Sequence, residues 1–144
     1  MTPDAVFGVC NTVALLMWLL LVVTPGRRVV AGVVTGALVP LLFAVVYVAI
    51  LVPRMGSSDG SFSTLDGVAK LFSDRWLLVA GWVHYLAFDL FLGSWQVRDA
   101  QRRGIPHAAV VPCLILTFLF GPAGLGAYLL LRLALRRGLS VAEA

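Results

Sequence analysis

The fold is decided by an uncharged run, AVFGVCNTVALLMWLLLVVTPG, which extends over 22 residues from Ala5 to Gly26. At a rise of 1.5 Å per residue, a helix of this length covers about 33 Å, which is enough to cross a hydrocarbon core of about 30 Å. No basic segment precedes the run, and no small-residue cleavage site follows it. We therefore expect a retained transmembrane helix here rather than a signal peptide.

Three further apolar runs follow along the chain. Val29 to Pro53 and Gly104 to Leu131 carry no charge over 25 and 28 residues. Trp76 to Val97 is interrupted by a single carboxylate, Asp89. We expect an all-α membrane protein, a bundle of four transmembrane helices in a single integral membrane domain over 1–144. The helices are expected at about 4–24, 29–52, 75–100 and 107–136.

Composition supports the same class of protein. Hydrophobic residues make up 60% of the chain and charged residues only 12%, and the mean hydropathy is +0.97. A soluble domain is about 45–50% apolar and about 25% charged. The net charge is +4, but the basic residues lie in short clusters between the apolar runs rather than in one patch. We therefore expect a lipid bilayer, and not a nucleic acid, as the partner.

The connection between the second and third runs contains an amphipathic pattern. Its apolar residues recur at three- and four-residue spacing: Phe62, Leu65, Val68, Ala69 and Phe72. This spacing predicts a short interfacial helix at about 62–73. A loop with scattered apolar residues is the alternative.

The last run allows two topologies. Gly121-Pro122-Ala123-Gly124 interrupts it, and two glycines with a proline weaken a helix. With four complete spans the basic residues divide five against six between the two sides, so the positive-inside rule does not decide the orientation. If residues 107–136 instead form a re-entrant segment that returns to the same side of the membrane, eight basic residues lie on that side and three on the other. We favour four spans and leave the re-entrant arrangement open.

The third run holds the residues most suited to chemistry. A charged Asp near the bilayer centre costs about 2.5–3.5 kcal/mol, so Asp89 should face the bundle interior and have a partner. Tyr85 lies one helical turn away, within reach of a hydrogen bond. At 100° per residue one face of this helix carries a set of polar, aromatic and glycine residues: Gly81, Trp82, Tyr85, Asp89, Gly93 and Gln96.

Two interpretations of Asp89 remain open. It either transfers a proton in a low-dielectric pocket, or it bonds a neighbouring helix as a neutral side chain. His84, Phe88 and Trp95 lie on a different face of the helix. His84 points about 140° away from Asp89, so a direct pair is not expected. For His84 we favour a helix-bridging or interfacial role.

Motifs for other chemistry are absent from the sequence. There is no glycine-rich phosphate loop, no HExxH and no Cys/His metal constellation. Cys10 and Cys113 fall inside apolar runs, where cysteine usually behaves as a small hydrophobe. We expect no cofactor and no metal.

The third and fourth runs resemble a known family. GWVHY at 81–85, FDLFLGSW at 88–95 and RDA at 98–100 are similar to the abscisic-acid-deficient-four-like membrane family. GIPH at 104–107, Pro112 and LTFLFGPAG at 116–124 continue the likeness, as does FSTLDGV at 62–68. The resemblance covers about residues 1–137. In plants this family is tied to neoxanthin formation, in which a violaxanthin epoxide opens to an allenic alcohol.

The resemblance gives the candidate residues possible roles. Epoxide opening is helped by an acid, which Asp89 with Tyr85 could supply, and allene formation needs a base, for which His84 or His107 is a candidate. A polyene would fit an apolar groove with Trp82, Phe88 and Trp95 in its wall. No motif rule assigns these roles residue by residue.

The sequence thus leaves two classes of function. The first is a membrane protein that binds a carotenoid or another long isoprenoid and, if it is an enzyme, isomerises a carotenoid epoxide. The second is a non-catalytic membrane partner or scaffold for another enzyme or assembly. The bias to arginine over lysine and the lack of a transit peptide favour a bacterial cytoplasmic membrane, and assembly into a homo-oligomer stays open.

Overall fold

The computed structural model describes residues 1–54, 56 and 60–135, and within these residues every regular element is a helix. The second helical stretch combines a π-helical segment, an α-helix and a short 3₁₀ turn. The elements are α1 (Pro3–Val23), η1 (Val30–Leu38), α2 (Val39–Leu51), η2 (Val52–Arg54), α3 (Leu65–Ser73), α4 (Arg75–Arg102), α5 (His107–Phe120) and α6 (Pro122–Ala134).

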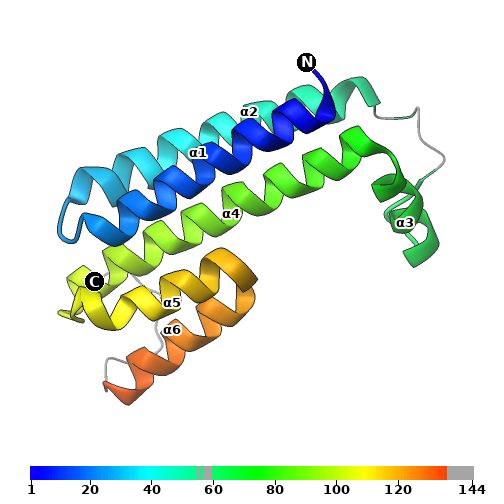
Figure 1. Ribbon diagram of the computed structural model, residues 1–144. Helices are drawn as coiled ribbons and strands as arrows, with labels where there is room; N and C mark the ends of the chain where they lie inside the picture. The colour runs from blue at the N-terminus through cyan, green and yellow to red at the C-terminus, as the bar shows by residue number, and fades with distance from the viewer. Residues whose placement is uncertain (55, 57–59, 136–144) are drawn as a thin grey trace.

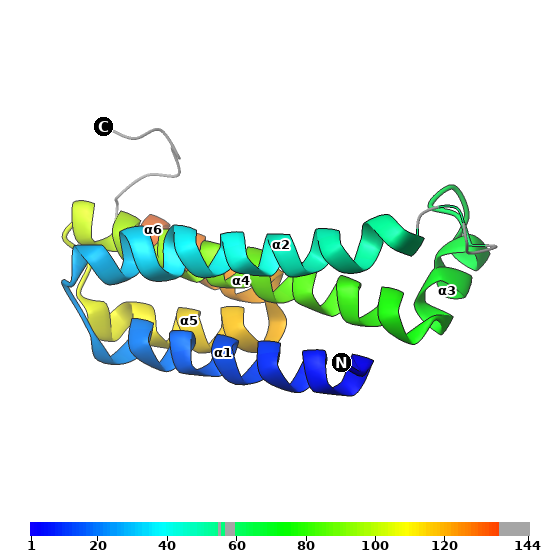
Figure 2. The ribbon, with the colours of Figure 1, turned by 90° about the horizontal axis from the view of Figure 1, so that it is seen from above.

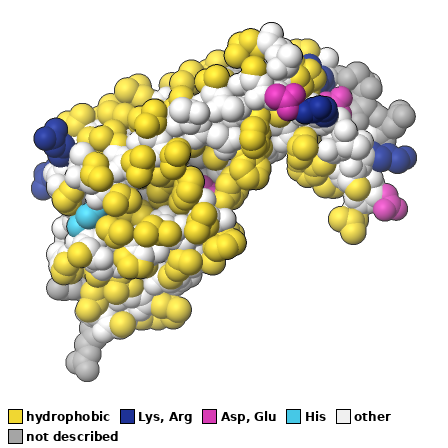
Figure 3. All heavy atoms as spheres, viewed as in Figure 1, with side chains coloured by type: hydrophobic (Ala, Val, Ile, Leu, Met, Phe, Trp, Pro, Cys, Tyr) yellow, Lys and Arg dark blue, Asp and Glu magenta, His cyan; other side chains and the backbone are white. Residues whose placement is uncertain are grey.

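Three helices are long and apolar enough to cross a membrane. They are α1 with 21 residues, the continuous stretch Val30–Arg54 with 25 residues, and α4 with 28 residues. They run side by side in both views of the ribbon (Figures 1 and 2). Hydrophobic side chains cover much of the visible flank of this bundle (Figure 3). Three of the four expected spans therefore have the length and composition that the sequence predicted.

The expected fourth span at 107–136 is wrong as a single helix. Gly121 adopts φ +25° and ψ −83°, which ends α5, and α6 begins at Pro122. Proline is well suited to the first position of the new helix because it has no N–H to leave unsatisfied. The two helices fold back on each other as an antiparallel hairpin, in which Gly124 packs against the backbone of Thr117 (Figure 1). This is the arrangement that the re-entrant alternative requires.

The short amphipathic helix is present as α3, which begins three residues later than predicted. Thr64 caps it, since its hydroxyl accepts a hydrogen bond from the N–H of Gly67 at 3.1 Å. The helix turns away from the bundle at the beginning of α4 (Figure 1). Its placement in a membrane interface stays a prediction.

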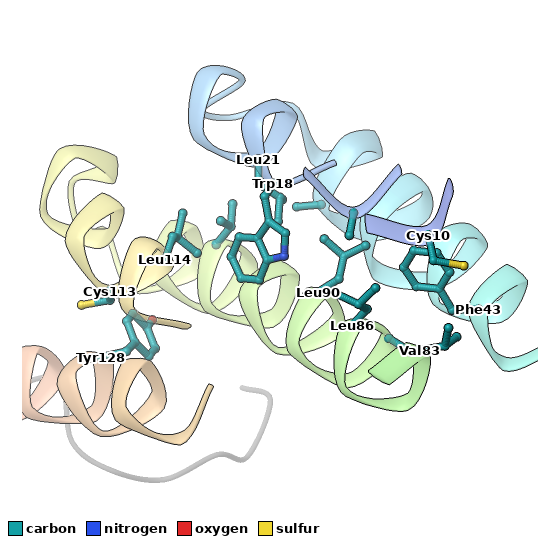
Figure 4. Packing of buried hydrophobic residues seen from close by; sticks show 14 of the residues in the cluster. Cys10, Trp18, Leu21, Phe43, Val83, Leu86, Leu90, Cys113, Leu114 and Tyr128 are labelled. Carbon is teal, nitrogen blue, oxygen red and sulfur yellow. The ribbon is translucent and has the colours of Figure 1, made fainter. Parts of the chain in front are cut away.

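The core lies around α4, which contacts every other long helix. Val83, Leu86 and Leu90 of α4 are buried against side chains of α1 and α2, including Trp18 and Phe43 (Figure 4). Towards its C-terminal end, α4 also packs against α5. This central helix carries most of the residues discussed below.

Candidate functional site at the tip of the hairpin

Asp89 lies in the middle of α4, opposite the point where the hairpin turns. Its carboxylate sits against Gly121, because a Cβ atom added to that glycine would be 2.7 Å from Oδ1 and 3.0 Å from Oδ2. Its Oδ2 atom is buried and has no hydrogen-bond partner among the described residues. Leaving a buried polar atom unpaired costs about 1–3 kcal/mol, so such an atom calls for an explanation.

Tyr85 lies one turn before Asp89, as the sequence predicted. Its hydroxyl donates a hydrogen bond to the carbonyl of Phe118 at 3.2 Å and is within reach of the Asp89 carboxyl as well. The tyrosine is partly buried and its ring packs against Trp82, with 5.3 Å between ring centroids. Tyr85 thus links α4 to the last turn of α5 and faces the same region as Asp89.

A hollow opens beside these two residues. The hairpin reaches only to the middle of α4, where Asp89 meets Gly121, and α3 covers the beginning of α4, where Phe72 lies against Gly81. Tyr85 is one turn from both Gly81 and Asp89 on the same helix face, so it lies between the two covered regions. The space-filling view shows a hollow between the hairpin and α3, bordered by hydrophobic side chains (Figure 3).

His84 lies away from Asp89, as its helical position predicted. Its ring packs between Tyr47 of α2 and Phe88, with centroid distances of 5.6 and 4.6 Å. It borders a cavity of about 390 Å³ between α2, α3 and α4, which Phe72 and Leu77 also line. His84 therefore lines a separate, largely apolar cavity and does not lie beside Asp89.

His107 lies at the opposite end of the hairpin from Asp89. It is the first residue of α5, and its Nε2 atom is 2.9 Å from the carbonyl of Val22 at the end of α1. Asp89 contacts Gly121, which directly follows the last residue of α5. A helix of 14 residues such as α5 is about 20 Å long. The structure does not bring His107 and Asp89 together.

The residues expected to bind a ligand divide into two groups. Gly93, Trp95 and Gln96 take part in helix packing. A Cβ on Gly93 would be 2.5 Å from the ring of Trp18, Trp95 makes an edge-to-face contact with Tyr128, and the Gln96 amide donates to Thr117 Oγ1 at 2.9 Å.

Two of the three remaining residues keep exposed surface. Trp82 is 40% exposed although its Nε1 atom donates to Asn11 on α1 at 2.9 Å, and Phe88 is 62% exposed. Gly81 is covered by the ring of Phe72, 2.5 Å from where its Cβ would stand. Trp82 and Phe88, with Tyr85 between them in the sequence, are the expected ligand contacts that stay accessible.

Sequence reasoning missed a buried polar cluster at the other end of α4. Asp99 accepts hydrogen bonds from Arg103 Nε at 3.0 and 3.1 Å and from the hydroxyl of Tyr128 at 2.7 Å, and Arg132 Nη1 lies 3.5 Å from it. Asp99 is only 3% exposed, and Tyr128 and Arg132 are 0% exposed. Asp99 and Arg103 stand four residues apart, as do Tyr128 and Arg132, and this spacing was the available signal. The cluster fastens α6 to α4.

No metal site is evident in the part of the chain that the structure describes, since no three metal-ligating side chains meet there. The site therefore offers a carboxyl, a phenol, aromatic rings and an apolar hollow. Those groups can bind an apolar molecule and can exchange protons with it.

Taken together, three helices long and apolar enough to cross a membrane, with a carboxylate held among them, indicate a helical protein of the integral membrane class. The chain belongs to the ABA DEFICIENT 4-like family, whose model matches residues 5–128. It is 29% identical over 131 residues to the protein ABA DEFICIENT 4, chloroplastic, of Arabidopsis thaliana. That alignment covers 85% of this chain and 58% of the relative, so the chain spans little more than half of the relative's length. No solved structure matches the chain.

Proposed function

We propose that this protein binds a long isoprenoid of the carotenoid class in the hollow beside Asp89 and isomerises it by proton transfer. The observation that carries the proposal is the buried Oδ2 atom of Asp89, which has no partner among the described residues and lies at the break between α5 and α6. A structural carboxyl would be expected to have both oxygens satisfied. An oxygen that is left unpaired in this way suits a group that awaits a ligand.

Proton transfer by Asp89 fits the opening of an epoxide. The protonated carboxyl gives its proton to the epoxide oxygen as the carbon–oxygen bond breaks. The resulting carboxylate then removes a proton from a neighbouring carbon, and the electrons of that carbon–hydrogen bond form the new double bond. The acid is restored, so the reaction is an isomerisation that needs no other reactant.

This scheme uses one carboxyl for both steps because neither histidine stands beside it. In this scheme Tyr85 orients the carboxyl or the substrate oxygen through its hydroxyl, which lies close to Asp89. The exposed rings of Trp82 and Phe88 offer apolar surface to a polyene. The location of the hollow on the apolar flank suits a substrate that enters from the bilayer.

The test is Asp89→Asn in the purified, detergent-solubilised protein, assayed with a carotenoid epoxide. Asparagine keeps the shape of the side chain but carries no transferable proton, so we expect near-native thermal stability and retained ligand with conversion lost. Asp4→Asn is the matched control, because Asp4 forms an exposed ion pair with Arg75, the first residue of α4.

Three results are distinguishable in this experiment. Loss of conversion with a stable, ligand-binding protein supports the catalytic role of Asp89. A loss of several kcal/mol of stability would indicate a charged, paired structural residue. Stable protein with undiminished conversion would leave Asp89 as a helix-bridging group. If the unmodified protein retains no carotenoid or other isoprenoid, the non-catalytic membrane partner becomes the better description.

A further inference from the structure

The connection between α1 and η1 meets the C-terminal end of α4 in a basic cleft. The cleft has a volume of about 280 Å³ and is lined by Arg28, Arg98, Gln101 and Arg102. The first of these residues is about 70 positions away from the others in sequence, so the fold and not a local sequence cluster assembles the cleft. None of the lining residues is acidic.

Arg98 is held in place by the backbone of η1. Its Nη1 atom donates a hydrogen bond to the carbonyl of Ala31 at 2.6 Å, and the guanidinium lies where a Cβ of Gly36 would stand. The missing side chain at Gly36 therefore makes room for this arginine. A guanidinium fixed in this way loses little entropy when an anion arrives.

Gln101 adds a neutral donor to the cleft. Its Nε2 atom is buried and has no hydrogen-bond partner in the described part of the chain. A buried amide N–H₂ without an acceptor is costly and suits a site whose acceptor comes from a ligand. The lining thus combines guanidinium groups with a donor that lacks an acceptor.

Basic side chains outnumber acidic ones among the described residues at this end of the bundle. Six arginines and one carboxylate of the described residues lie here: Arg27, Arg28, Arg98, Arg102, Arg103, Arg132 and Asp99. That carboxylate is already bonded to Arg103 and Tyr128. The space-filling view shows Lys and Arg side chains gathered at this end, beside the connection between α1 and η1 (Figure 3).

We infer that the cleft of Arg28, Arg98, Gln101 and Arg102 binds a phosphate group, and that an anionic phospholipid headgroup supplies it. Arginine forks match phosphate oxygens in geometry and charge. The cleft lies where apolar helices end, which is the depth at which phospholipid phosphates are found, and basic pockets between transmembrane helices are suited to such headgroups. This inference does not depend on the function proposed for Asp89.

The experiment measures thermal stability of the full chain in a non-ionic detergent while one ligand is titrated. The ligands are phosphatidylglycerol, phosphatidylcholine with the same acyl chains, and inorganic phosphate at constant ionic strength. A ligand that binds the folded state raises the midpoint with concentration, which gives an apparent dissociation constant. We expect phosphatidylglycerol to stabilise the protein and phosphatidylcholine to have little effect.

The double variant Arg28→Gln/Arg102→Gln is expected to raise the apparent dissociation constant for phosphatidylglycerol about tenfold or more. Arg28 and Arg102 are exposed, so the variant should fold. Gln101→Leu should weaken binding without changing net charge. Arg75→Gln, at the opposite end of α4, is the control and should leave binding unchanged.

Each outcome decides the inference. Stabilisation by phosphatidylglycerol alone supports the lipid source, and stabilisation by inorganic phosphate that the double variant loses supports the same site with a soluble source. Equal effects of the two lipids with none from phosphate, or an equal loss in the Arg75→Gln control, would overturn the inference.

Discussion

The carboxylate of Asp89, halfway along α4, lies against the backbone of Gly121, the residue at which α5 ends and α6 begins. The contact joins the ionisable carboxylate in the middle of a candidate span to the break in the helical hairpin. A side chain at position 121 would occupy the space of the carboxyl oxygens. The break between helices α5 and α6 and the candidate site therefore lie at the same place in the fold.

Replacing Gly121 with alanine should damage both the turn and the site. The new Cβ would stand 2.7 Å from Asp89 Oδ1, and φ +25° is a strained backbone conformation for alanine. We expect a loss of about 1–3 kcal/mol in the free energy of unfolding. Gly126→Ala is the matched control, because that helical glycine has open space around it and alanine should stabilise the helix by up to about 1 kcal/mol. Unfolding of both variants in a denaturing detergent checks the difference, and equal stabilities would contradict the contact.

Gly93→Ala tests the packing of α1 on α4 separately from the site. A Cβ at this position would be 2.5 and 2.6 Å from atoms of the Trp18 ring, which is itself only 4% exposed. Overpacking of this kind costs about 1–3 kcal/mol. Gly8→Ala on α1 meets no atom within 4 Å and should be tolerated. Thermal denaturation followed by tryptophan fluorescence would show both effects, and an unchanged midpoint for Gly93→Ala would argue against close packing at Trp18.

The three long spans and the amphipathic helix could be predicted because each leaves a local signal. Uncharged runs of 22 and 25 residues are long enough to cross a bilayer, and the 3–4 spacing around Leu65 and Phe72 is that of a helix. Asp89 was recognisable for the same reason, as a carboxylate inside an apolar run.

The hairpin and the buried cluster could not be predicted with the same ease. Two short apolar helices joined by one glycine give the same uncharged run as a single long helix, and only the backbone angles of Gly121 separate the two cases. The partners Asp99 and Arg132 become neighbours only after that fold-back. Likewise, His107 and Asp89 are far apart because His107 begins α5, whereas Asp89 contacts Gly121 just beyond the end of that helix.

Asp99→Asn should be much more damaging than a change to an exposed carboxylate. The substitution removes the negative charge of Asp99 from beside the guanidinium of Arg132, which is 0% exposed. Breaking a buried pair in this way costs about 3–5 kcal/mol. The exposed Arg75–Asp4 pair is the comparison, and Asp4→Asn should cost no more than about 1 kcal/mol. Similar thermal midpoints for the two variants would show that the buried cluster does not fasten α6 to α4.

The hairpin makes a topological prediction that differs from that of a four-span bundle. With 13 residues, α6 is about 20 Å long, too short to cross a hydrocarbon core of about 30 Å. Tyr128 and Arg132 also meet Asp99 near the end of α4, so α6 returns to the side from which α5 began. Leu135 should therefore share a side with Arg27, and Ser63 should lie on the other side.

Single cysteines at 27, 63 and 135 test this, in a chain whose buried Cys10 and Cys113 have been changed to alanine. All three positions are exposed. A membrane-impermeant maleimide applied to intact cells should label Ser63→Cys, and should reach Arg27→Cys and Leu135→Cys only after permeabilisation, because the arginine-rich end is expected inside. Labelling of Leu135→Cys together with Ser63→Cys would restore the four-span bundle. Labelling of Arg27→Cys and Leu135→Cys alone on intact cells would keep the hairpin and reverse its orientation.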